Sequence, residues 1–354
     1  MNNALLRRIG ATTIALLASV YSSASPAQES VTLAGWGGVT TEATLKGLFS
    51  MAKSQNINVR SELHGGLPGL VAQVNGGRVA WDLVMYGFVD CERAAKDGLL
   101  EPIDYGVVNN ISQIDKQRYA KPDYVGVFAF SYGVAYNTKK FGASPPTGWK
   151  DFWDVKKFPG RRALFATGTY VLEAALLADG VPDSEVYPLL KTPAGVDRAF
   201  KKLEEIKPHI AVWWNSSGQA MQLIRDGEVD MIMLANGRAR ALIQDGANVG
   251  FVWNQAMIED ECLAVPKGAR NKAAAMKLIN SSLLPEPQAR FGTMIDYGPV
   301  NQAAYSLGIM TPEQVAQMPT APANLNKQFV ISPEFYASPE GRRAIERFTR
   351  FIQR

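Results

Sequence analysis

The stretch SVTLAGWGGVTTEATLKGLF, residues 30–49, contains the pattern from which the fold follows. Val31 and Leu33 alternate with small or polar residues, as in a β-strand that buries one face. Three glycines around Trp36 then mark a turn, and the apolar residues beyond it recur with helical spacing. The stretch therefore predicts a strand that leads through a glycine turn into an amphipathic helix.

The same alternation continues along the chain. INVRSEL (57–63) and WDLVMYG (81–87) have the composition of strands, and LPGLVAQVNGG and DCERAAKDG have that of short helices ended by glycine. Strands that alternate with helices predict an α/β fold with mostly parallel central sheets. VGVFAFSYGVAYNTKKF (125–141) predicts two extended segments, broken near Ser131 and Tyr132, after which a second set of such elements follows.

The length of 354 residues exceeds what one ordinary core accommodates, which predicts two domains. We expect residues 28–134 and 262–320 to form a first lobe, and residues 135–261 to form a second. Residues 321–354 are expected to be a C-terminal helical segment. The chain would cross between the lobes near 132–137 and return near 259–265.

Residues 1–27 have the features of a secretory signal peptide. Arg7 and Arg8 precede an apolar run of about a dozen residues, and small residues follow it. The run is shorter than the ~20 residues that a transmembrane helix needs. Cleavage is expected after Ala27, with Ala24 as the alternative. The mature protein would then be exported to the periplasm.

The charges and the rare residue types exclude several classes of function. The 37 Lys and Arg and 33 Asp and Glu are mixed along the chain, so neither nucleic acid nor an anionic membrane is an expected partner. With only His64 and His209, a histidine metal site or a serine–histidine triad is not expected. His64, in ELHGGLPG, is interpreted as a surface or loop residue. Cys91 and Cys262 are candidates for one disulfide in an exported protein.

Residues that follow the predicted strands are the candidates for a binding site, because ligands of open α/β sheets lie beyond the carboxyl ends of the strands. They are mostly aromatic or polar and include one guanidinium. No carboxylate dyad, nucleophile elbow or phosphate loop occurs among them, so a binding cleft is expected rather than an enzyme. These residues are Trp36, Tyr86, Thr167, Thr169, Trp214, Asn215, Asn236 and Arg238.

Three stretches resemble a known family. They are the early GWGG, the stretch DGEVDMIMLANGRA, and ECLAVPKGARNKAAAMKLIN followed by DYGPVN. Together they resemble the periplasmic substrate-binding proteins of ABC importers, in the spermidine/putrescine branch. The resemblance implies the two-lobed fold of a type II periplasmic binding protein, with strands that cross a hinge. It also implies a monomer without cofactor that delivers a small ligand to an ABC permease in the inner membrane.

The resemblance and the strand ends together give a set of ligand-binding candidates. They are Trp36, Gly37, Tyr86, Thr167, Tyr170, Trp214, Arg238, Glu261 and Tyr297. Polyamine binders of the family place acidic residues where Thr167 to Tyr170 stand here, and a small neutral residue at the position of Arg238. These differences favour a short zwitterion such as the ω-amino acid γ-aminobutyrate, with a polyamine as the alternative ligand.

Several points stay open from sequence alone. Glu259, Asp260 and Glu261 are adjacent, and any of the three is a candidate to face the ligand. Arg238 and Glu261 would alternatively pair with each other, and Trp36 would alternatively pack beneath the helix that follows it. An exported enzyme and a chemosensory receptor are the functions of other classes that the same fold would serve.

Overall fold

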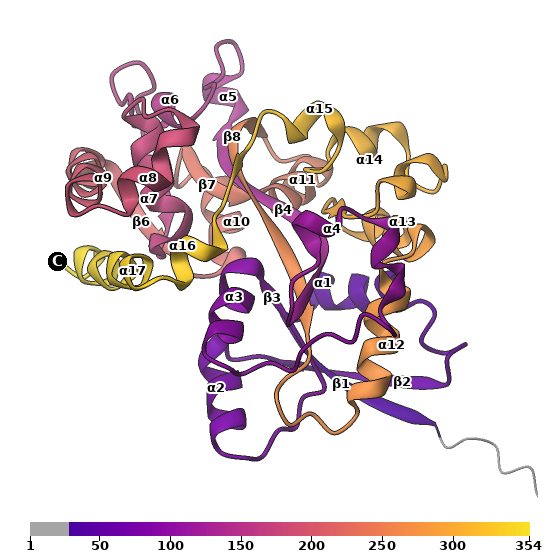
Figure 1. Cartoon of the computed structure of the whole chain (residues 1–354). Coiled ribbons are helices and arrows are strands. Elements are labelled where there is room, and N and C mark those ends of the chain that lie inside the picture. Colours follow the sequence, from indigo (N-terminus) through magenta and orange to yellow (C-terminus); the bar gives the residue numbers. More distant parts are fainter. Residues whose placement is uncertain (1–27) are drawn as a thin grey trace, which may run out of the picture.

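A computed structural model of the protein describes residues 28–354, so the predicted signal peptide lies outside the described residues. The chain forms two α/β lobes that are joined by long strands (Figure 1), and the predicted fold class is confirmed. Within the described part of the chain, no helix combines the length and the apolar character that crossing a bilayer requires.

Three parallel strands form the centre of the first lobe. β1 (Glu29–Gly35) lies between β2 (Ile57–Leu63) and β3 (Leu83–Gly87), and its alternating residues Val31 and Leu33 are fully buried. The helices that pack around this sheet are α1 (Gly38–Ala43) with its π-helical continuation Thr44–Leu48, α2 (Leu67–Asn75), α3 (Phe88–Lys96), α4 (Lys116–Tyr119), α12 (Lys272–Ser282) and α13 (Pro285–Met294).

The second lobe repeats this plan. β5 (Arg162–Phe165) lies between β6 (Ile210–Trp214) and β7 (Met231–Ala235), and all three strands are parallel. Its helices are α5 (Thr138–Phe141), α6 (Trp149–Trp153), α7 (Gly168–Ala178), α8 (Val186–Leu190), α9 (Pro193–Ile206), α10 (Ser217–Arg225) and α11 (Asn236–Gln244).

Two long antiparallel strands connect the lobes. β4 (Tyr124–Asn137) and β8 (Val249–Ala264) pair with each other, β8 also pairs with β3, and β4 also pairs with β7. The prediction of two separate segments in residues 125–141 is wrong. The ladder with β8 continues through Ser131 and Tyr132, and register shifts on either side of this point absorb the irregularity. One strand therefore runs from the first lobe into the second.

The last part of the chain covers the junction. Its elements are β9 (Gly298–Pro299), α14 (Pro312–Ala316), α15 (Pro322–Leu325), β10 (Phe329–Val330), α16 (Pro333–Ala337) and α17 (Pro339–Ile352). In Figure 1, α16 lies between α3 and the second lobe, and it packs on α3. α17 places Phe348 and Phe351 in the core of the second lobe. The residue boundaries proposed for the lobes stay a prediction.

Candidate functional site

One face of the β4–β8 ladder carries the side chains that meet between the lobes. In this register Phe128 lies opposite Glu261, Phe130 lies opposite Glu259, and Tyr132 lies opposite Met257. Because side chains alternate along a strand, these three pairs point to the same side. Two carboxylates and three aromatic rings therefore share the surface at which the lobes join.

Glu261 is a buried carboxylate that has no basic partner in the part of the chain that the structure describes. Only 2% of the residue is exposed, and its Oε1 accepts a hydrogen bond from the indole Nε1 of Trp36. Among residues 28–354, no lysine or arginine forms an ion pair with it. Burial raises the pKa of Glu261 well above its ordinary value, and the nearby carboxylates of Glu259 and Asp90 raise it further. A cation placed beside Glu261 would stabilise its ionised form.

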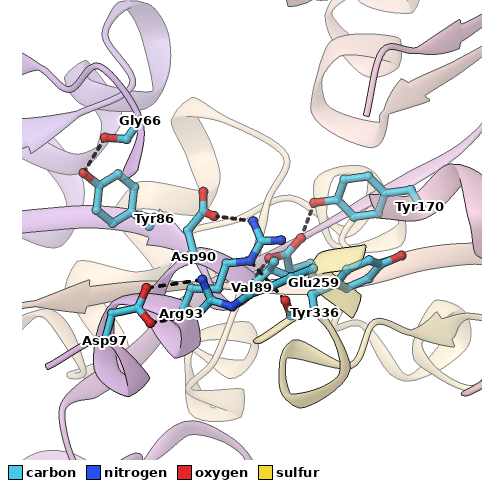
Figure 2. Close-up of polar contacts among 10 residues, drawn as sticks. Gly66, Tyr86, Val89, Asp90, Arg93, Asp97, Tyr170, Glu259 and Tyr336 are labelled. Atoms are coloured by element: carbon cyan, nitrogen blue, oxygen red, sulfur yellow. Dashed lines mark hydrogen bonds and ion pairs between the residues drawn. The ribbon is translucent and has the colours of Figure 1, made fainter. Parts of the chain in front are cut away.

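Glu259 joins elements of both lobes (Figure 2). Its Oε1 accepts from the backbone N–H of Val89, in the first turn of α3, at 3.0 Å, and its Oε2 accepts from the hydroxyl of Tyr170 in α7. A Cβ at Gly87 would lie 2.5 Å from Oε1, so only glycine allows this approach. Burial raises the pKa of Glu259 to about 7, although both hydrogen bonds lower it.

Asp260, which lies between Glu259 and Glu261 in the sequence, points to the opposite face of β8. Asp260 makes a two-point ion pair with Arg118, whose Nε and Nη2 lie 2.7 and 2.8 Å from the carboxylate oxygens. Its charge is therefore already balanced. Of the three adjacent acids, the strand alternation directs Glu259 and Glu261 toward the shared face.

Arg238 lies at the start of α11, directly after β7. It is half-buried, and it forms no hydrogen bond or ion pair with any residue in the described part of the chain. At the preceding Gly237, a Cβ would lie 2.7 Å from the Tyr297 ring, so glycine lets that ring approach. Burial raises the pKa of Tyr297, while Arg238 lowers it and Glu261 raises it. Both side chains therefore shift the pKa of the Tyr297 phenol, in opposite directions.

The second lobe contributes stacked rings. Trp214 is 1% exposed and lies parallel to Phe165, with ring centroids 4.2 Å apart, and its buried Nε1 has no hydrogen-bond partner among residues 28–354. Tyr132 packs against Phe165 and Tyr170, with centroids 5.5 and 4.6 Å away. Thr167 is the N-cap residue of α7, without a side-chain hydrogen bond to the helix.

Tyr170 has an unusual backbone conformation. Its φ of 71° lies in the left-handed region, inside a kink of α7. Such a conformation costs a non-glycine residue about 1–3 kcal/mol and persists only where the surroundings hold it. In this conformation the Tyr170 hydroxyl donates to Glu259.

Trp36 lies at the edge of the first lobe. Half of it is exposed (49%), its ring meets His64 edge-on at 4.3 Å, and His64 lies 4.7 Å from Tyr86. His64 accepts from Gly66 N–H through Nδ1, and within the described part of the chain its buried Nε2 has no hydrogen-bond partner. Burial lowers the pKa of His64 to about 4, so the ring is neutral at physiological pH.

Two predicted residues have their polar groups occupied. The hydroxyl of Tyr86 donates to the carbonyl of Gly66 at 3.1 Å. The backbone N–H of Gly37, whose φ is 77°, donates to the Thr41 hydroxyl at 2.8 Å. Tyr86 could therefore contact a ligand through its ring, and Gly37 contributes through the backbone conformation of the turn.

Sequence reasoning missed four residues of this cluster, which are His64, Phe130, Tyr132 and Phe165, and it left open which of Glu259, Asp260 and Glu261 faces the site. His64 and Phe165 end or directly follow parallel strands, so the rule applied to Trp36 applies to them equally. Phe130 and Tyr132 repeat every second residue in FAFSY, which is the signal of one strand face. Dividing this strand into two segments hid that pattern.

The charges of the site are separated. Three carboxylates, those of Asp90, Glu259 and Glu261, influence one another near the start of α3, and Arg238 lies on the second lobe. No group of His, Cys, Asp and Glu in residues 28–354 has the arrangement of a metal site. The arrangement would suit a molecule that is cationic at one end and anionic at the other, with aromatic rings around its methylenes.

Comparison with known proteins identifies the class. Residues 65–323 match the model of the bacterial extracellular solute-binding protein family, and the chain belongs to this family. The resemblance noted in the sequence is thereby confirmed. Members of such families bind small molecules for transport.

Individual relatives agree with this. The chain is 34% identical over 344 residues to the gamma-aminobutyric acid-binding protein of Pseudomonas aeruginosa, covering 96% of both chains. It is 27% identical over 242 residues to the spermidine/putrescine-binding periplasmic protein of Escherichia coli, covering 66% of this chain and 67% of the relative. A solved ABC transporter substrate-binding protein from Bradyrhizobium japonicum shares 40% identity, with a TM-score of 0.86 over 92% of this chain and all of that one.

Proposed function

We propose that this protein is a periplasmic receptor that captures a short zwitterion, with an ω-amino acid such as γ-aminobutyrate as the preferred ligand, and delivers it to an ABC permease. Residues 1–27 would direct its export and then be cleaved, and the mature protein would act as a monomer without catalysis. The Pseudomonas relative named for gamma-aminobutyric acid supports the choice of ligand.

The observation that carries the proposal is a pair of ionisable side chains, Glu261 and Arg238, that have no ionic partner among residues 28–354. Glu261 is buried with an indole as its hydrogen-bond donor, and Arg238 has no ion pair among the described residues. A ligand ammonium at Glu261 and a ligand carboxylate at Arg238 would balance both. The rings of Trp36, Tyr132 and Tyr297 would then surround the methylenes, and an ammonium would gain further from the ring faces.

A polyamine fits this distribution less well. Two ammonium groups need an anionic site at each end, whereas Arg238 would repel one of them. Asp260 offers no help, because Arg118 already neutralises it. The acid cluster around Glu259 and Glu261 would accept one end only.

Calorimetry on refolded, ligand-stripped protein tests the proposal. The panel is γ-aminobutyrate, butyrate, butylamine and putrescine, so that each analogue lacks or exchanges one charged end. We expect one-to-one binding of γ-aminobutyrate without product formation, and at least about 30-fold weaker binding of the others, since each loses a charge-assisted contact. Tightest binding of putrescine would contradict the role given to Arg238.

A further inference from the structure

Another buried carboxylate, that of Glu173, lies a short distance along α7 beyond the strained Tyr170. Glu173 is fully buried, and both of its oxygens accept from the hydroxyl of Tyr336 at 2.8 Å, while Oε1 also accepts from Tyr187 at 2.9 Å. The backbone N–H groups of Tyr170 and of Glu173 itself also stabilise this carboxylate. Glu173 therefore interacts electrostatically with the backbone of the segment whose left-handed residue, Tyr170, donates to Glu259.

Tyr336 lies in α16 and belongs to the C-terminal segment, residues 321–354. While its hydroxyl binds Glu173 of the second lobe, its carbonyl accepts from Nε of Arg93, in α3 of the first lobe, at 3.1 Å. Arg342 adds a contact to the same end of α3, because its Nη2 lies 2.9 Å from Asp97. Tyr336 thus contacts both lobes, and Figure 2 shows its contact with Arg93 of the first lobe.

Two routes therefore join α3 to α7. One runs from Val89 N–H through Glu259 to the Tyr170 hydroxyl, and the other runs from Arg93 through Tyr336 to Glu173. Tyr170 lies at the kink of α7 and Glu173 follows it in the same element, so the two routes close into a ring. Separating the lobes would require both routes to stretch or break.

We propose that Tyr336 and Glu173 are positioning residues of the binding site. They hold Tyr170 in its left-handed conformation against Glu259, and they tie the C-terminal segment to both lobes, so that the ring slows the opening that releases ligand. Neither residue belongs to the proposed ligand contacts. The inference rests on the proposed function for its ligand readout, and on the fold alone for its exchange readout.

The test compares Tyr336→Phe with Tyr124→Phe. Tyr124 is a matched control, because it is also a buried tyrosine that donates to a carboxylate, Glu92 at 2.8 Å, but both partners lie in the first lobe. Stopped-flow fluorescence with γ-aminobutyrate as the probe gives the two rate constants. We expect Tyr336→Phe to raise the dissociation rate about tenfold with an unchanged association rate, and Tyr124→Phe to change neither.

Hydrogen exchange of the ligand-free variants provides the second readout. Amides around Tyr170 and around Val89 should exchange faster in Tyr336→Phe than in Tyr124→Phe, because opening of the ring exposes both. If no variant binds γ-aminobutyrate, the proposed function fails, while this exchange pattern still decides the inference. Equal exchange in the two variants would overturn it.

Two further variants keep the proposal falsifiable if Tyr336→Phe folds poorly. Arg93→Met breaks the other end of the contact, at a side chain that is 19% exposed. In the ligand-free protein it should speed amide exchange around Tyr170 as Tyr336→Phe does, and exchange at the wild-type rate would contradict the proposal. In a double-mutant cycle, Tyr336→Phe and Tyr170→Phe should be non-additive in dissociation rate, and additive effects would contradict action through Tyr170.

Discussion

Replacing Glu261 by glutamine should have opposite effects on ligand affinity and on the stability of the ligand-free protein. Glutamine keeps the size of the side chain and an oxygen that accepts from Trp36 Nε1. It removes a buried negative charge that no basic side chain of the described residues balances. The ligand loses its ammonium partner, whereas the empty protein loses an unfavourable buried charge.

The magnitudes follow from this burial. Losing one partner of a desolvated ion pair costs about 2–5 kcal/mol, so affinity for γ-aminobutyrate should fall by roughly 30-fold to several thousand-fold. Because the folded-state pKa of Glu261 is raised, the wild-type penalty is absent in acid and grows as pH rises toward that pKa. At pH 8 the ligand-free variant should therefore melt at least about 2 °C higher than wild type.

Isothermal titration calorimetry and thermal melts at pH 4 and 8 measure both effects. Asp260→Asn is the control, because it removes the neighbouring charge whose partner is Arg118. That variant should be destabilised by about 3 kcal/mol with its affinity unchanged. A Glu261→Gln protein that binds as tightly as wild type, or that melts lower at pH 8, would refute the reasoning.

Other perturbations test separate parts of the structure. Arg238→Met should weaken binding of a carboxylate ligand by about 2–5 kcal/mol without lowering the melting temperature, since Arg238 has no ion pair among the described residues; calorimetry that finds unchanged affinity removes it from the site. Because burial raises the pKa of Glu173 to about 7, the wild type should lose stability as pH rises from 5 to 8. In urea titrations the free energy of unfolding of Glu173→Gln should therefore rise by about 3 kcal/mol relative to that of wild type across this range. A difference that does not change with pH would contradict this sign. Cys91 and Cys262 form a disulfide that spans 171 residues, so Cys91→Ser with Cys262→Ser should cost up to about 5 kcal/mol in the same titrations, and an unchanged midpoint would argue against it.

Local patterns in the sequence were sufficient to predict the fold class. Val31 and Leu33 fit only a strand with one buried face, and the glycine turn at Gly37 fits only a rapid change of direction into a helix. The strand-end rule brought Trp36, Trp214 and Arg238 forward as site candidates, because parallel strands deliver their ends to one edge. These inferences use short-range information, which a single sequence contains.

Contacts between distant segments could not be predicted in the same way. Tyr336 and Glu173 are 163 residues apart, and neither has a local pattern that names the other. The side toward which Glu259, Asp260 and Glu261 point depends on the register of β8 against β4. That register is fixed when both strands are continuous, and it would not be fixed if β4 were two separate segments. His64 was missed because its glycine-rich surroundings suggested a loop, although it directly follows β2.

The central claim is that an ammonium at Glu261 and a carboxylate at Arg238 define the ligand. A crystal structure of the protein soaked with γ-aminobutyrate tests it most directly. The account predicts density between the lobes, with the amine within hydrogen-bonding distance of Glu261 and the carboxylate on the Arg238 guanidinium. Density that runs in the reverse direction, or a ligand that touches neither side chain, would contradict it.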